Sequence, residues 1–160
     1  MKRKIIALII CIACISAANA QNYSTQLLET VNQRDVSVVT INSSMIESLR
    51  RREANRDVQA FLSDLNFLRI MTVDNPRNAA AFYQTAISLV RENNDFEELL
   101  SMEEGRQRVV IVALTPENNR TPEIVMISHI NNASLTIVNI TGNIGISDLS
   151  QLATTIRNLR

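Results

Sequence analysis

The stretch that decides the fold is residues 97–141, EELLSMEEGRQRVVIVALTPENNRTPEIVMISHINNASLTIVNIT. It contains four runs rich in β-branched and apolar residues that are typical of strands: Glu97–Met102, Gln107–Leu114, Pro122–Ile130 and Leu135–Thr141. The short segments between them contain Gly, Pro and Asn, the residues that favour turns. Because consecutive strands joined by short turns pair with their neighbours, this stretch predicts an antiparallel meander.

The residues before this stretch alternate between helix and strand patterns. We expect a short helix over Asn22–Asn32, strands over Val36–Ile41 and Phe67–Val73, and a helix over Asn78–Arg91. Two further helical stretches lie between the two strands. The first begins with a capping box, Ser44 to Glu47, and the second carries the apolar stripe Val58, Phe61, Leu62 and Leu65.

A last helix is expected after the meander. Gly142 to Gly145 reads as a turn and Ser147 as an N-cap, followed by an apolar face of Leu149, Leu152, Ala153, Ile156 and Leu159. The element order βα(α)βαββββα predicts an α+β domain of two layers. We expect a mainly antiparallel sheet of about five or six strands with helices packed on one face. This single domain would span residues 36–160, after a lead segment over residues 21–35.

The first twenty residues have the three parts of a secretory signal peptide. Met1–Lys4 is basic, Ile5–Ile15 is apolar, and Ala18-Asn19-Ala20 puts small residues where signal peptidase cuts. An apolar run of about 11 residues is too short to span a bilayer as a helix. We therefore expect cleavage before Gln21 and export to the periplasm or cell envelope, with no transmembrane span afterwards. Lipidation of Cys14 is not expected, because Cys11 stands where a lipobox has an aliphatic residue.

The charge of the remaining chain argues against two classes of partner. Every Lys lies in the first four residues, so the part after Ala20 has 13 Arg, no Lys and 16 acids, a net charge of −3. A nucleic-acid binder normally has a basic surface, and a polybasic membrane binder needs clustered Lys or Arg. Arg50-Arg51-Arg52 fan around a helix and have Glu47 and Glu53 within reach, so we interpret them as a solvated face.

The residue inventory argues against catalysis and against a metal or cofactor. Both cysteines lie in the expected signal peptide, and His129, the single histidine, sits in an apolar strand with no acid nearby in sequence. Neither a Cys nucleophile nor a lysine Schiff base is then possible, and one His cannot supply a structural zinc site. We therefore expect a protein that is not an enzyme and has no cofactor.

Two other functions stay open on the sequence. The densest acids could serve a small envelope hydrolase, if two carboxylates met in one pocket: Glu97, Glu98, Glu103 and Glu104. Against it, a chain with no Trp and two Tyr lacks the aromatic platforms of most sugar sites. The chain could also carry a small apolar ligand in a closed cavity.

The first hypothesis is an interaction module that uses an uncovered face of the sheet. Residues 109–114 and 124–127 are apolar on both sides, which is typical of central strands covered on both faces. If helices cover one face, the other needs an envelope protein, a second copy of this chain, or its own terminal segments. The candidate interaction face is Val110, Val112, Val125 and Ile127.

Several segments resemble a known family. They are Phe67–Thr72, Phe82–Arg91, Phe96–Leu100, Val109–Leu114, Glu123–Val125 and Ile137–Ile144, followed by Leu149 and Leu152. Over roughly residues 36–156 the chain resembles the domain of unknown function family 4252, small exported proteins of Bacteroidetes. The resemblance brings no activity, cofactor or site residue. It implies an envelope-response setting, because members occur near genes of extracytoplasmic-function sigma and anti-sigma factors.

Overall fold

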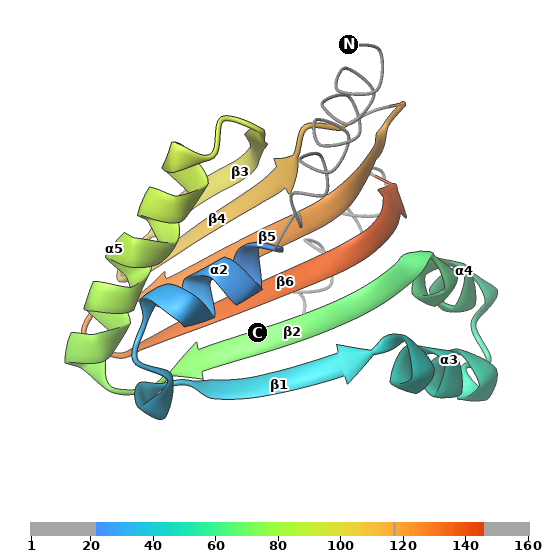
Figure 1. Ribbon diagram of the computed structural model, residues 1–160, viewed down its shortest axis with the longest axis horizontal. Coiled ribbons are helices and arrows are strands. Elements are labelled where there is room, and N and C mark those ends of the chain that lie inside the picture. The colour runs from blue at the N-terminus through green and yellow to red at the C-terminus, as the bar shows by residue number, and fades with distance from the viewer. Residues whose placement is uncertain (1–21, 117, 146–160) are drawn as a thin grey trace, which may run out of the picture.

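The computed structural model describes residues 22–116 and 118–145. The described elements are α2 (Tyr23–Thr30), a 3-10 turn η1 (Gln33–Asp35), β1 (Ser37–Asn42), α3 (Ser43–Arg52), α4 (Arg56–Asp64), β2 (Leu65–Val73), α5 (Pro76–Glu92), β3 (Phe96–Glu104), β4 (Gln107–Leu114), β5 (Arg120–Ile130) and β6 (Ser134–Gly145) (Figure 1). The expected signal peptide and the helix expected after Ser147 lie outside the described residues. No helix within the described residues is long and apolar enough to cross a membrane.

The described strands form one antiparallel sheet in the order β1-β2-β6-β5-β4-β3. The last four strands are the predicted meander, and β6 brings it beside β2, where Ile137 lies opposite Met71. The central position expected for β4 and β5 is confirmed, and so is the α+β class. The expected turn at Gly142–Gly145 is instead the end of β6.

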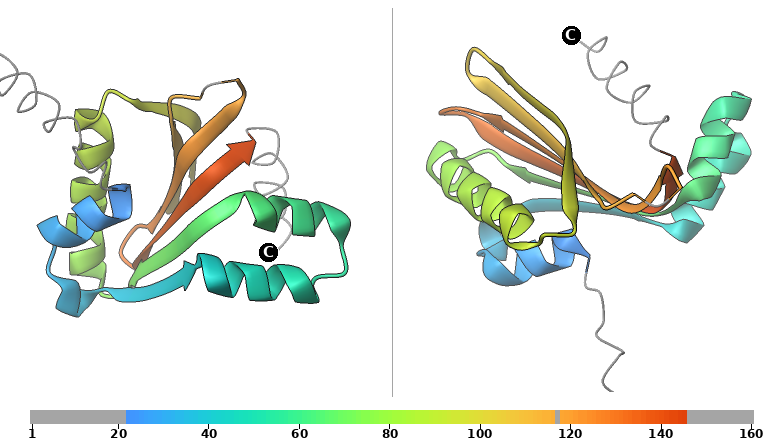
Figure 2. Two further views of the ribbon diagram at one scale, coloured as in Figure 1. Left: turned by 45° about the vertical axis from the view of Figure 1, so that its right-hand side comes forward. Right: turned by 90° about the horizontal axis from the view of Figure 1, so that it is seen from above.

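One face of the sheet is covered by α2 and α5, as the two views in Figure 2 show. Leu27 from α2 and Ala79, Phe82 and Ala86 from α5 are buried against the strands. The side chains that meet them alternate along each strand, as the pleat requires: Met71, Val73, Val110, Val112, Val125, Ile127, Leu135 and Ile137. This is the larger of the two cores.

The pair α3–α4 packs at the far end of the sheet, against residues of the opposite face (Figure 1). Ile46 of α3 is 4% exposed and joins a second apolar cluster with Leu65, Ile124, Ile140 and Ile144. The helices are thus divided between the two faces, whereas we expected them on one. Below, α3 and α4 together are called the arm.

Asparagine is the N-cap residue, just before the first helical residue, of every described α-helix. The side chains of Asn22, Asn42, Asn55 and Asn75 each accept hydrogen bonds from backbone N–H groups of the first turn. Such caps satisfy donors that have no partner within the helix. The cap of α3 is therefore Asn42, whose Oδ1 lies 3.1 Å from the N of Met45, and not the predicted Ser44.

Candidate interaction surface

The four residues of the predicted interaction face lie in the core. Val110, Val112, Val125 and Ile127 are 7%, 1%, 0% and 0% exposed and pack beneath α2 and α5. The expectation that they line an uncovered face is wrong, because the sequence shows that two faces are apolar but not which face the helices choose. Val110 and Val112 also border a hollow of about 460 Å³ between α5 and the β3–β4 hairpin.

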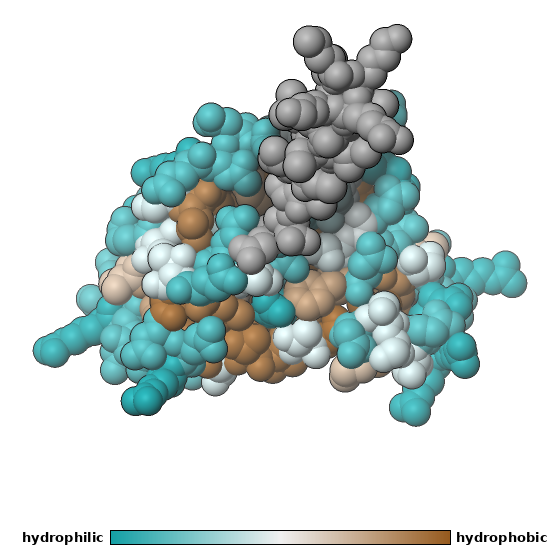
Figure 3. All heavy atoms as spheres, viewed as in Figure 1, coloured by the Kyte–Doolittle hydropathy of each residue, from teal (hydrophilic) through white to brown (hydrophobic). Residues whose placement is uncertain are grey.

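Exposed apolar side chains gather instead at β1 and the arm. Of seven large hydrophobic side chains exposed in the described residues, five belong to these elements: Val38, Val39, Met45, Leu49 and Val58. The other two, Leu100 and Ile130, lie on β3 and at the end of β5. Figure 3 shows hydrophobic surface in brown along the lower border of the molecule, where Figure 1 places β1.

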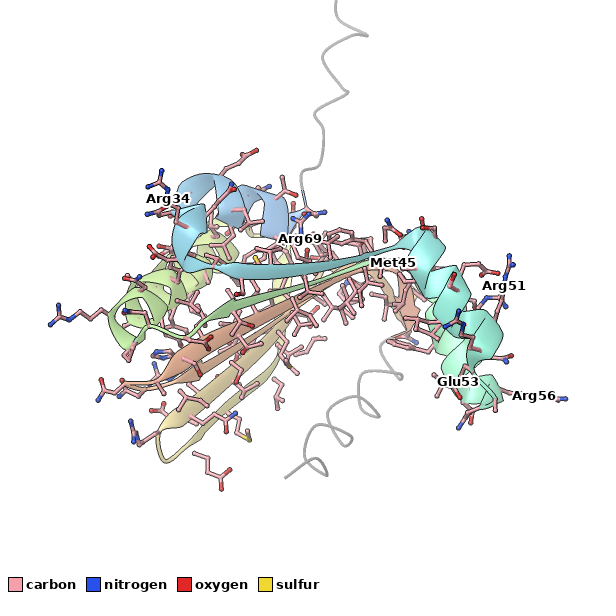
Figure 4. All side chains as sticks on the ribbon, turned by 90° about the horizontal axis from the view of Figure 1, so that it is seen from below. Arg34, Met45, Arg51, Glu53, Arg56 and Arg69 are labelled. Atoms are coloured by element: carbon pink, nitrogen blue, oxygen red, sulfur yellow. The ribbon has the colours of Figure 1, made fainter. Side chains whose placement is uncertain are left out.

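The helix α3 has an inner and an outer apolar side. Ile46 points into the second cluster, while Met45 and Leu49 are 50% and 48% exposed. Because residues four apart lie on one side of a helix, Met45 and Leu49 form a continuous outer stripe. Figure 4 shows Met45 where β1 meets α3, with Arg51, Glu53 and Arg56 toward the free end of the arm.

The arm also carries charged side chains. Glu47 pairs with Arg50 at 2.8 Å and with Arg51 at 2.9 Å, as its spacing predicted, whereas Glu53 accepts from the backbone N of Asn55. The hydrogen bonds from both guanidinium groups lower the pKa of Glu47 to about 2. In the described part of the chain, Arg52 and Arg56 make no ion pair, and neither do Glu53 and Asp57, so the free end of the arm carries exposed charges of both signs.

The acids of the hydrolase hypothesis are spread along the edge strand β3. Glu97, Glu98, Glu103 and Glu104 are all exposed, and Glu103 forms an ion pair with Arg108 at 2.8 Å. The hollow beneath α5 is bordered by Glu98 and a neighbouring hollow by Glu103, so neither holds two of these carboxylates. Among the described residues, no group of three or more His, Cys, Asp or Glu could hold a metal ion.

His129 lies near the end of β5, as expected, but it packs against a specific partner. Its ring stacks on Tyr83 of α5, with centroids 4.6 Å apart and planes 16° apart. Both rings border a hollow of about 230 Å³ together with Arg108. Burial, and then the charge of Arg108, lower the pKa of His129, so both favour the neutral imidazole.

A buried polar cluster was not predicted from the sequence. Glu123 is 6% exposed, and its Oε1 accepts from the backbone N of Tyr23 at 2.9 Å and from Asn139 Nδ2 at 2.7 Å. Burial raises the pKa of Glu123, and the two hydrogen bonds oppose that rise. The phenol of Tyr23 donates to the carbonyl of Ala86 at 2.8 Å, so the cluster joins α2 to both β5 and α5.

A second polar contact joins α2 to the sheet. Arg69 of β2 donates to Ser24 Oγ at 3.1 Å and lies over the ring of Phe67, 4.7 Å from its centroid. For Glu123 and Arg69, the available sequence signal was a charged residue next to or within an apolar strand run. Their partners Tyr23 and Ser24, however, lie in α2, far away in sequence, and no local pattern reveals that pairing.

Comparison with known proteins agrees with the resemblance seen in the sequence. The family described as Domain of unknown function (DUF4252) matches residues 23–152, from the first residue of α2 through all six described strands. No curated protein and no solved structure gives a significant match. Because the match covers most of the chain, this protein belongs to the DUF4252 family of domains of unknown function.

Proposed function

We propose that the chain is an exported, non-enzymatic interaction module of the periplasm or cell envelope, acting in an envelope-response setting. The signal-peptide pattern of residues 1–20 supports export, and the family resemblance supports the setting. The observation that carries the interaction role is the outer stripe of the arm, where Met45 and Leu49 are about half exposed. Large apolar side chains grouped on one surface are a feature of protein-binding sites.

The chemistry of the arm specifies the kind of partner. The outer stripe offers apolar contact, and Arg52, three residues after Leu49 on α3, has no ion-pair partner among the described residues. A fitting partner is an envelope protein with an apolar surface bordered by carboxylates, because complementary charge gives specificity and faster association. Arg51 is 74% exposed and keeps a guanidinium edge available beyond its contact with Glu47.

Affinity capture after crosslinking in cells tests this surface. We expect the tagged chain to recover an envelope protein that the variants Met45→Gln and Leu49→Gln recover poorly. Arg52→Glu should reduce the recovery as well. The matched control is Leu100→Gln, which changes a side chain of similar exposure, 40%, on the opposite edge of the sheet.

The outcome of this capture is decisive for the arm. If Met45→Gln and Leu49→Gln recover the same protein as fully as Leu100→Gln does, the outer stripe is not the binding surface. Export is tested separately by N-terminal sequencing of the protein from a periplasmic extract. A first residue of Gln21 supports the proposal, whereas a full-length cytoplasmic protein contradicts it.

A further inference from the structure

The two edge strands of the sheet, β1 and β3, differ in whether they are protected against pairing with a strand of another molecule. The edge strand β3 carries four glutamates in nine residues, and its pairing with β4 is interrupted between Glu98 and Leu100. Charged side chains and bulges are devices that prevent a sheet from pairing with another sheet at its edge. The edge at β3 is therefore protected.

The edge at β1 has none of these devices. Its sequence SVVTIN contains no charge and no Pro, and its pairing with β2 runs without interruption from Ser37–Thr72 to Asn42–Phe67. Val38 and Val39 are 41% and 56% exposed, and β1 pairs only with β2 among the described strands. The outer backbone groups of such a strand can pair with another chain.

We propose that two copies of this chain associate through β1, which pairs antiparallel with β1 of the partner subunit about a twofold axis. Charge selects this occupant. Two β3 edges would bring carboxylates against carboxylates, whereas two β1 edges meet without any charged side chain. Among the described strands, β1 is thus the edge that can pair with its own copy. The proposal goes beyond the function of the arm and does not depend on it.

The register follows from the apolar row that ends at β1. On the face opposite α5, Val39 lies beside Ile70, and the row continues through Val138, Met126 and Ile111. A twofold axis must place one residue opposite itself. Centring the axis on Val39 continues this row into the second copy and places Val38 opposite Thr40 of the partner subunit. β-Branched pairs of this kind stabilise antiparallel strands.

Disulfide trapping tests the register. Directly opposed residues in an antiparallel pair have Cα atoms about 4.5–5.5 Å apart, within the range that a disulfide can bridge. The sequence has no cysteine after Cys14, so in the exported form the variant Val39→Cys carries the only thiol. We expect mild oxidation to convert Val39→Cys to a covalent dimer and to leave the control Leu100→Cys mostly monomeric.

Sedimentation of the exported form tests the association itself. We expect a dimer, and Val39→Lys should raise its dissociation constant at least about tenfold, because it places two like charges opposite each other. A wild-type monomer at all concentrations, or a dimer that Val39→Lys leaves intact and that gives no Val39→Cys crosslink, would overturn the proposal. The variants Met45→Gln and Leu49→Gln test partner binding by the arm, and the Val39 variants test the dimer. Failure of one proposal therefore leaves the other standing.

Discussion

Glu123 of β5 accepts a hydrogen bond at 2.9 Å from the backbone N–H of Tyr23, which lies 100 residues earlier in the sequence. Tyr23 is the first residue of α2, so a buried carboxylate meets the end of the helix where its N–H groups are unsatisfied. A negative charge is favourable at that end of a helix. The contact fixes the start of α2 on the sheet.

Removing this acceptor should destabilise the domain. Glu123→Ala removes the acceptor of two donors inside the protein. The backbone N–H of Tyr23 loses its partner at 2.9 Å, and Asn139 Nδ2 loses its partner at 2.7 Å. A buried donor without an acceptor costs about 1–3 kcal/mol, so we expect about 2 kcal/mol in chemical denaturation. Glu97→Ala, on the exposed edge, should change stability by less than about 0.5 kcal/mol. Equal effects of the two variants would contradict the structural role of Glu123.

The buried carboxylate should also make stability depend on pH. Burial raises the pKa of Glu123 above its ordinary value of 4.5, so the folded protein binds this proton more readily than the unfolded chain. The resulting stabilisation is fully present below pH 4.5 and is lost as the pH rises through the folded pKa.

The matched variant for this pH effect is Glu123→Gln, which keeps an acceptor oxygen but does not titrate. We expect the difference in unfolding free energy, wild type minus variant, to grow as the pH falls from neutral to 4.5. A difference that is constant over this interval would show that the pKa of Glu123 is not raised. Glu47 affects the unfolding free energy in the opposite direction at more acidic pH. Its pKa is lowered to about 2, so its stabilising contribution is lost as the pH falls toward that value.

The strands and most helices could be predicted because they follow from local patterns. Residues 107–114 are a strand in both the prediction and the structure, and α5 exceeds the predicted helix by only a few residues. Leu65 shows where such patterns fail. It continues the apolar stripe of α4, but it is the first residue of β2, since pairing with β6 outweighs the helical spacing.

The covered face and the polar cluster could not be predicted for a different reason. Val125 and Ile124 are both apolar, and only the path of α2 and α5 across the sheet decides which core each one joins. In the same way, nothing near Glu123 in the sequence indicates that Tyr23 will supply its partner. These features depend on contacts between distant segments, which periodicity does not report.

The two sides of α3 should respond differently to truncation. Ile46 is 4% exposed and Leu49 is 48% exposed, although they lie less than one turn apart. Ile46→Ala should cost about 2–4 kcal/mol through lost burial and the cavity it leaves. Leu49→Ala should cost less than about 0.5 kcal/mol. Comparable losses in urea denaturation would mean that Leu49 is also buried, and the outer stripe of the arm would not exist.

Gly142 should tolerate no side chain. A Cβ at this position would overlap the carbonyl oxygen of Asp64, where α4 ends and β2 begins. Backbone cannot move aside as a flexible side chain can, so we expect Gly142→Ala to destabilise by about 1–3 kcal/mol. The control is Gly105→Asn, because Gly105 has φ +58° with open space around it, and Asn accepts that conformation. Thermal melts in which both variants match the wild type would contradict this close approach.

His129 offers a direct test of the Tyr83 contact, because it is the only histidine and its NMR signals need no assignment among several. Burial, and then Arg108, lower its pKa below the ordinary 6.5, so its titration should be displaced to acid pH. Arg108→Gln removes the second cause, and we expect the pKa to move back toward 6.5 without reaching it, since the ring stays stacked on Tyr83. Arg106→Gln, in the same hollow, is the matched control, because Arg106 is not among the causes of the shift. A titration at 6.5 in the wild type, or equal shifts in both variants, would show that the imidazole is solvated rather than packed against Tyr83 near the charge of Arg108.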